Sequence, residues 1–155
     1  MKLKEFIRTD AIVPALQATT RDEAIRELVN SLAGVGAIEA SAVDEIVAAV
    51  INREKHGSTG FGKGVAVPHV KHAKIKSMSG TVGRSAAGVD FAALDHQPVY
   101  SIFLLLSPEN QPQQHLQAMN VVFQNLQKDM FRRFLRQSDT REKILDLLEE
   151  ADSGK

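Results

Sequence analysis

The sequence predicts an α/β fold in which helices cover both faces of a mixed β-sheet. Apolar residues recur at helical spacing in residues 20–57 and again in residues 113–148. Between these two regions lie short apolar runs of strand length. One of them, residues 99–106 or "VYSIFLLL", is typical of a central strand that is buried on both faces. A sheet enclosed between two helical layers accounts for all three observations.

Two helices are predicted before the first strand. Thr20 and Glu23 have the spacing of a capping box, in which the two side chains satisfy free backbone amides at the helix start. The apolar face that follows consists of Ala24, Ile25, Leu28, Val29 and Leu32. A second helix is expected from Ser41 to Gly57, and its apolar stripe is Val43, Ile46, Val47 and Val50. Arg53 falls in the last turn of this helix, close to the loop that follows.

Three strands are predicted between the helical regions. Residues 65–67, "VAV", form a short buried strand that Pro68 closes. A second strand covers residues 78–84, and residues 89–98 form a turn-rich connection to the third strand at 99–106.

The last part of the chain is predicted to be helical. A long helix begins near Gln113, and its inward positions are Leu116, Met119, Phe123 and Leu126. Two shorter helices follow, around residues 131–135 and 144–148, and Asp139 is assigned as the cap of the second. Met130 is assigned to the core together with the phenylalanines.

Composition narrows the class of protein. The chain has 155 residues, which predicts a single domain over residues 1–150 and a frayed tail at 151–155. Its 19 basic and 19 acidic residues give no net charge, so nucleic acid and anionic membranes are not expected partners. The chain has no cysteine, which excludes disulfides and thiolate chemistry. Because no apolar run could span a bilayer and no secretory segment is recognisable, we expect a cytoplasmic protein without membrane insertion.

Residues 57–69, "GSTGFGKGVAVPH", place four glycines before a Pro-His pair. The included GxxxxGK pattern approaches a nucleotide-binding P-loop, but Gly64 replaces the required hydroxyl residue and the flanking helix and strand are in reversed order. ATP is therefore not an expected ligand. A tight surface turn would explain one or two of the glycines. We favour a loop whose amides closely approach a ligand or partner, with the Ser58 and Thr59 hydroxyls as further donors.

Two histidines follow predicted strands. His69 comes directly after Pro68, and His115 lies on the first turn of the helix after residues 99–106. Because sites in open α/β sheets lie at the carboxyl ends of strands, the two imidazoles are expected to meet. The alternative for His69 is an ordinary polar residue at a loop entrance. His72 lies near His69, but the acidic residues nearby follow no metal-ligand spacing, so no metal is expected.

Residues 53–69, "REKHGSTGFGKGVAVPH", and residues 88–119, "GVDFAALDHQPVYSIFLLLSPENQPQQHLQAM", resemble enzyme IIA domains of the bacterial phosphoenolpyruvate-dependent sugar phosphotransferase system. The similarity is to the fructose/mannitol class, including its nitrogen-regulatory relative. It continues through the terminal helices and covers nearly the whole chain. It implies the mannitol/fructose-type enzyme IIA sandwich.

This resemblance implies a phosphotransferase in which His69 carries the phosphoryl group. His115 would be the second active-site histidine, and Arg53 would flank the site. The phosphoryl-binding loop would comprise Ser58, Thr59 and Gly60. Such a site needs no metal and no other cofactor, because phosphoryl transfer depends mostly on positioning and charge stabilisation. Val70 stands where the family often has glycine, which would narrow the approach of a partner.

The resemblance also implies the protein partners. The phosphoryl donor would be a phosphohistidine carrier protein, and the acceptor would be a cysteine of enzyme IIB. Because this chain has no cysteine, the IIB domain is expected on a separate chain. The alternative is a nitrogen-type regulatory protein, in which the phosphorylation state of His69 controls binding to partner proteins.

Overall fold

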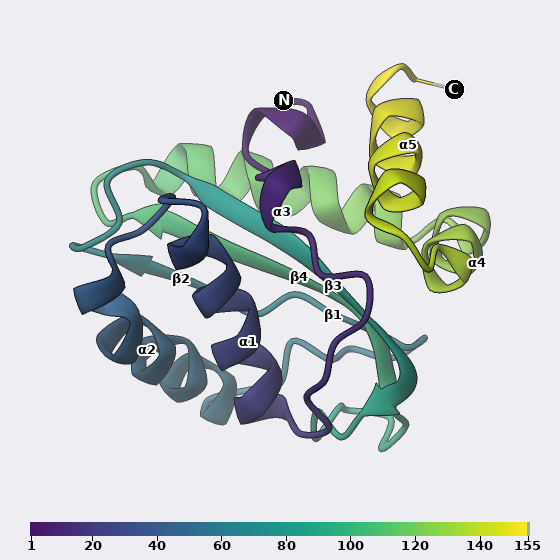
Figure 1. The fold of residues 1–155 in the computed structure, drawn as a ribbon, viewed down its shortest axis with the longest axis horizontal. Helices are drawn as coiled ribbons and strands as arrows, with labels where there is room; N and C mark the ends of the chain where they lie inside the picture. Colours follow the sequence, from purple (N-terminus) through teal and green to yellow (C-terminus); the bar gives the residue numbers. More distant parts are fainter. Residues whose placement is uncertain (155) are drawn as a thin grey trace.

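Four β-strands form a mixed sheet between two helical layers (Figure 1), as the sequence predicts. The computed structural model describes residues 1–154. β4 (Val99–Pro108) lies in the centre of the sheet. β1 (Val65–Ala66) and β2 (His69–His72) pair with one edge of β4 in parallel, one after the other. β3 (Ser79–Val89) pairs with the other edge in antiparallel orientation.

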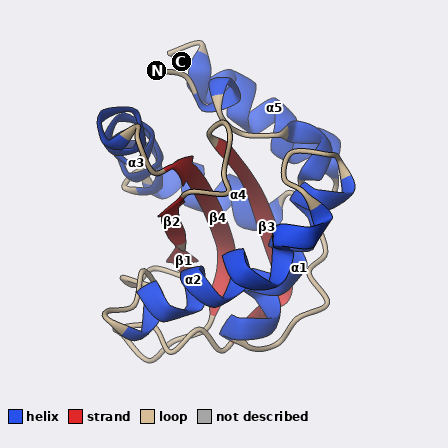
Figure 2. Cartoon of the chain, turned by 90° about the vertical axis from the view of Figure 1, so that its left-hand side faces the viewer, coloured by secondary structure: helices blue, strands red, loops and turns tan. Residues whose placement is uncertain are grey.

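One face of the sheet packs against α1 (Arg21–Gly34) and α2 (Val43–Lys55), as Figure 2 shows. On this side β4 contributes Ile102, Leu104 and Leu106. The predicted start of α1 is confirmed, because the Thr20 side chain accepts a hydrogen bond from the Glu23 amide. The Glu23 carboxylate in turn accepts a hydrogen bond from the Thr20 hydroxyl at 2.7 Å.

The opposite face carries the three C-terminal helices, α3 (Pro112–Leu126), α4 (Asp129–Gln137) and α5 (Arg141–Asp152). Phe103 and Leu105 of β4 belong to the core on this side. Successive side chains of a strand point to opposite faces, so β4 supplies two separate cores in alternation. This explains why its sequence is almost continuously apolar.

Two element starts differ from the predictions. Pro68 has no backbone N–H and interrupts the ladder, but the chain then pairs with β4 again. His69 is therefore the first residue of β2, whereas the sequence predicted that it would follow the end of the strand at residues 65–67. The second helix begins at Val43 and not at Ser41, because a 3-10 turn at Ala40–Ala42 precedes it.

Four assignments in the C-terminal helices are wrong. Leu116, Met130 and Phe134 are 61%, 53% and 46% exposed, so none of them belongs to the core. The inward side of α3 is instead formed by His115, Ala118, Met119, Val122, Asn125 and Leu126. The cap of α5 is Thr140, whose side chain accepts a hydrogen bond from the Lys143 amide, and not Asp139. Asp139 binds the Lys143 ammonium at 2.9 Å.

The N-terminal segment lies beside the end of α5 (Figure 2). Asp152 accepts hydrogen bonds from the amides of Leu3 and Lys4 at 2.6 and 3.0 Å. These contacts explain why α5 continues to Asp152, past the point at which fraying was expected. The N-terminal segment also contains short 3-10 turns at Leu3–Glu5 and Thr9–Ala11. Among residues 1–154, no helix is long and apolar enough to cross a membrane.

Candidate active site

The imidazole rings of His69 and His115 lie close together where β2 meets α3. Their centroids are 5.4 Å apart and their planes are inclined by 46°. His69 pairs with Leu105, whose side chain belongs to the core beneath α3. Register partners point to the same face of a sheet, so His69 also points towards α3. His115, on the first turn of α3, meets it there, and the expected proximity of the two rings is present in the structure.

A backbone carbonyl fixes the protonation pattern of His69. Its Nδ1 atom lies 2.8 Å from the carbonyl oxygen of Val67. Since a carbonyl oxygen only accepts hydrogen bonds, Nδ1 must carry a proton. The lone pair of the neutral ring is therefore on Nε2, which makes this atom the nucleophile of the site.

Ser107, near the end of β4, holds the second histidine. Its Oγ atom lies 2.6 Å from Nδ1 of His115, and both residues are buried. When the hydroxyl donates to Nδ1, the proton of the neutral His115 ring is on Nε2. In that tautomer His115 can donate a hydrogen bond to an anion beside it.

Burial lowers the pKa of both histidines. For His69, burial is the main cause, the hydrogen bond to Val67 opposes it, and the charges of Arg53 and Lys71 lower the pKa further. For His115, burial followed by the charges of His69 and Lys71 lowers the pKa to about 4. Both rings are therefore mostly neutral at pH 7, the form in which His69 can act as a nucleophile.

The end of α2 holds the glycine loop. Arg53 donates a hydrogen bond from Nη1 to the carbonyl oxygen of Gly57 at 2.9 Å. Glu54 is only 2% exposed, and its carboxylate accepts hydrogen bonds from both the amide and the hydroxyl of Thr59. Thr59 thus uses both of its donors inside the protein, so its side chain shapes the loop.

Ser58 and Gly60 form a tight turn within the same loop. The Ser58 Oγ atom accepts a hydrogen bond from the Gly60 amide at 3.0 Å and keeps its own hydrogen for donation. The Gly60 carbonyl accepts a hydrogen bond from the Leu94 amide at 2.7 Å. A Cβ atom on Gly60 would lie 2.9 Å from the Cβ of Ala93, so close packing requires glycine here.

Side chains point alternately to the two faces of the sheet along β2, and this places the cation of Lys71 at the site. Lys71 lies two residues after His69 on the same strand and therefore on the same face of the sheet. Its charge lowers the pKa of both histidines. Val70 lies between His69 and Lys71 on the strand and packs against the core on the α1–α2 side. The Val70 side chain therefore points away from His69 and does not add bulk beside it.

Three residues of this site lie outside the sequence prediction. Lys71 would follow from the period of two along a strand, but "HVKH" has no clear strand pattern. Ser107 gives a weak signal as a polar residue at the end of an apolar strand. Glu54 gives none, because its burial depends on how the loop folds back over the end of α2.

The remaining candidates for chemistry lie elsewhere. His72 is 3.7 Å from the Glu45 carboxylate, which also binds Lys74 at 2.5 Å. Within residues 1–154, no group of three or more His, Cys, Asp or Glu side chains is placed to hold a metal ion. The sequence GxxxxGK leads into a two-residue strand, so the loop is not followed by the helix whose N-terminus binds the phosphates in a P-loop.

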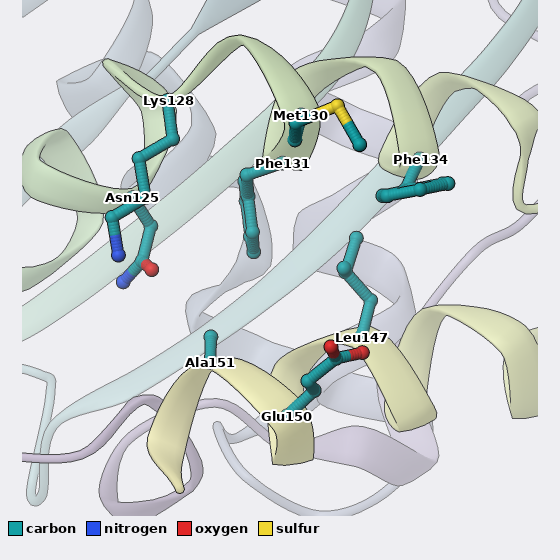
Figure 3. Close-up of a pocket in the computed structure, with 8 residues that line it drawn as sticks. All are labelled: Asn125, Lys128, Met130, Phe131, Phe134, Leu147, Glu150 and Ala151. Carbon is teal, nitrogen blue, oxygen red and sulfur yellow. The ribbon is translucent and has the colours of Figure 1, made fainter. Parts of the chain in front are cut away.

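A groove between α4 and α5 contains neither His69 nor His115 (Figure 3). Its apolar lining residues are Met130, Phe131, Phe134, Leu147 and Ala151. Asn125, Lys128 and Glu150 stand at its edge (Figure 3). It brings together no nucleophile and base, so the paired histidines remain the candidate active site.

Comparison with known proteins identifies the class. The family described as "Phosphoenolpyruvate-dependent sugar phosphotransferase system, EIIA 2" matches residues 5–151. The chain belongs to this family.

Relatives within the family are of two kinds. The chain is 33% identical over 148 residues to the nitrogen regulatory protein of Bradyrhizobium diazoefficiens, which covers 96% of this chain and 95% of that protein. It is also 30% identical over 153 residues to the PTS system fructose-specific EIIABC component of Bacillus subtilis. That match covers 98% of this chain but only 24% of the Bacillus protein, so the chain spans about a quarter of its length.

Solved structures show the same fold. The crystal structure of the nitrogen regulatory protein IIA-Ntr from Neisseria meningitidis superimposes with a TM-score of 0.83 at 29% identity, over 93% of this chain and 97% of that one. Enzyme IIA-mannitol from Escherichia coli, solved in complex with phosphorylated enzyme IIB-mannitol, gives a TM-score of 0.75 at 20% identity. The latter match covers 94% of this chain and 99% of that one, and it confirms the enzyme IIA sandwich.

Proposed function

We propose that this protein is a cytoplasmic phosphocarrier that takes a phosphoryl group from a phosphohistidine carrier protein onto Nε2 of His69. An enzyme IIB then receives it, as the complex formed by the mannitol enzyme IIA neighbour suggests. The observation that carries this proposal is the hydrogen bond between Nδ1 of His69 and the Val67 carbonyl. Because Nδ1 is hydrogen-bonded to the backbone and carries the proton, the nucleophilic lone pair is on Nε2.

The transfer is a displacement at phosphorus. The Nε2 lone pair of His69 forms the new N–P bond while the N–P bond of the donor breaks, and its electron pair returns to the donor ring. The His69 ring gains positive charge as the bond forms. Because Nδ1–H donates to the Val67 carbonyl, that dipole stabilises the charge. The step requires no cofactor.

We assign three groups to the stabilisation of the phosphoryl oxygens. His115 lies beside His69 and can donate from Nε2, and the charges of Arg53 and Lys71 act on the same site. Phosphoryl transfer needs mostly positioning and charge stabilisation, which such donors supply. Among the three loop residues, Ser58 is the one with a free hydroxyl hydrogen, so we assign it a supporting contact and assign Thr59 and Gly60 to the shape of the loop.

A regulatory role is the second candidate. It rests on the similarity to a nitrogen regulatory protein over 95% of that protein's length. In this role the phosphoryl group on His69 would change the charge of the exposed surface and thereby select the partner protein. Leu116, which is 61% exposed beside the buried His115, would give that partner an apolar contact next to the phosphorylated ring.

Incubation with labelled phosphoenolpyruvate, enzyme I and the carrier protein tests the shared step. The label should map to His69, should be labile to acid, and should be lost in His69→Ala. His56→Ala, which changes an exposed histidine, serves as the control and should be labelled normally. A His69→Ala protein that is still labelled would contradict the proposal. Transfer of the label to enzyme IIB then separates transport from regulation, because only the transport role requires it.

A further inference from the structure

A cavity of about 630 Å³ lies between α4, β3 and the turn before β1. Five cationic side chains and one carboxylate line it, namely Lys63, Arg84, Arg132, Arg133, Arg136 and Asp129. The proposed phosphoryl transfer uses none of them. In a chain with no net charge, so many cations in one cavity repel one another and need an explanation.

Contacts with the protein fix three of the arginines. Arg84 donates from Nε to the Arg136 carbonyl at 2.6 Å and from Nη1 to the Pro14 carbonyl at 3.2 Å. The Arg136 guanidinium lies 3.6 Å from the centre of the Tyr100 ring. Arg132 donates from Nη1 to the Leu126 carbonyl at 2.7 Å. These partners hold the side chains in place but do not neutralise them, so the cations are arranged before any ligand arrives.

The one carboxylate that lines the cavity, that of Asp129, does not balance the charge of the five cations. Asp129 binds Arg132 at 3.4 Å and Arg133 at 3.0 Å, so one carboxylate serves two arginines. The six charged residues that line the cavity carry a net charge of +4. Lys63 adds to this charge from an exposed turn and has a φ of +61°, a conformation that few residues other than glycine adopt.

This cavity is separate from the histidine site. Arg84 pairs with Ser101 on β4, whereas His69 pairs with Leu105, so the two lie four residues apart along the strand. At the usual strand rise that is about 13 Å. On α3, His115 is in the first turn, whereas Arg132 contacts the carbonyl of Leu126, the last residue. An anion bound in the cavity would therefore not occupy the position of a phosphoryl group on His69.

We propose that this cavity is a second anion site, which binds a small molecule through a diphosphate or triphosphate group. The forked donors of arginine match phosphate oxygens in pairs, and a charge of +4 suits a ligand with several negative charges. Recognition is through the phosphates alone. No aromatic residue is among those that line the cavity, and the Arg136 guanidinium already lies over the nearby Tyr100 ring, so this face of the ring offers no stacking surface to a nucleobase.

Calorimetric titration with inorganic tripolyphosphate, in the absence of magnesium, tests the site. We expect saturable binding of one molecule that weakens as salt is raised. The double variant Lys63→Gln/Arg133→Gln removes two exposed cations of the cavity and should weaken binding about tenfold or more. Its matched control, Arg26→Gln/Lys76→Gln, removes the same charge from exposed positions elsewhere and should bind as the parent does. An ADP titration should show no gain in affinity over pyrophosphate.

Several results would overturn the inference. These are the absence of saturable binding, an equal loss in both double variants, or binding of an acidic protein but of no small phosphate compound. Tighter binding of ADP than of pyrophosphate would overturn the assignment to phosphates alone. Labelling of His69 should be normal in both double variants, and His69→Ala should still bind tripolyphosphate. The binding test can therefore fail without contradicting the proposed phosphocarrier function, and the labelling test can fail without contradicting the anion site.

Discussion

The buried carboxylate of Glu54 accepts hydrogen bonds from both the amide and the hydroxyl of Thr59, five residues further along the chain. Glu54 is the residue after Arg53, so the end of α2 anchors the glycine loop at two adjacent positions. The loop beside His69 is therefore held by buried polar contacts, and its glycines alone do not determine its shape.

Removing the Thr59 hydroxyl should destabilise the protein. In Thr59→Val, the buried Glu54 carboxylate loses one of its hydrogen-bond donors, which should lower the free energy of unfolding by about 1–3 kcal/mol. Chemical denaturation measures this change. Thr19→Val makes the same chemical change at an exposed position and should have an effect within about 0.5 kcal/mol. Equal unfolding free energies for Thr59→Val and the parent would show that the contact does not stabilise the loop.

Ser107 should determine the tautomer of His115. If the Ser107 hydroxyl donates to Nδ1, nitrogen NMR of the parent protein at pH 7 should show His115 protonated at Nε2. In Ser107→Ala this constraint is lost, so the two tautomers should mix and phosphoryl transfer to His69 should slow. Finding the proton of parental His115 on Nδ1 would remove its proposed role as a donor to the phosphoryl group.

The two histidines should titrate below the ordinary histidine range. Proton NMR should give His115 a pKa of about 4 and His69 a pKa below 6.5, and burial is the first cause in both cases. The charge of Lys71 also lowers both pKa values, so Lys71→Gln should raise both of them. Lys76→Gln, at an exposed lysine paired with Glu39, is the control and should change neither. Unchanged pKa values in Lys71→Gln would place that ammonium away from the site.

Stability should depend on pH for the same reason. Above pH 6.5 the His115 ring is neutral in the folded and the unfolded chain, so it has no effect. Between pH 6.5 and about 4 the unfolded chain binds a proton that the folded protein excludes, so the free energy of unfolding falls as the pH falls. The loss is at most about 3 kcal/mol, and solvent screening reduces it. Denaturation curves of His115→Gln should show a weaker acid dependence than those of the parent.

The sheet and its layers could be predicted because local patterns determine them. The strand at 99–106 supplies both cores, so its sequence is apolar throughout and its central position can be read directly. His69 and His115 could be paired because each adjoins a buried strand. Their actual geometry differs in detail, since Pro68 separates two strands and His69 starts the second one.

The rotation of α3 and the anchors of the site could not be predicted. A helix with Leu116 and Met119 fits an apolar face, but packing against β4 turns His115 inward and leaves Leu116 exposed. Helical periodicity cannot anticipate this rotation, because it depends on which neighbours the helix meets. The burial of Glu54 has a similar origin, since its partner Thr59 reaches it only after the loop has folded.

The roles of the two histidines should separate kinetically. His69 has its lone pair on Nε2 and forms the covalent bond. The ring centroid of His115 lies 5.4 Å from that of His69, and we expect His115 to stabilise the transferring charge. Loss of one such donor typically slows a reaction about a hundred- to a thousand-fold, and partial solvent exposure of His69 places the expected effect near or below the lower value. His115→Ala should therefore still be phosphorylated on His69, but with slower transfer both from the donor and to the acceptor. Rapid-quench labelling of His115→Ala, His69→Ala and the control His56→Ala measures the difference. Parental rates in both directions for His115→Ala would reduce His115 to a structural residue, and a phosphoryl group found on His115 itself would mean that the two roles are reversed.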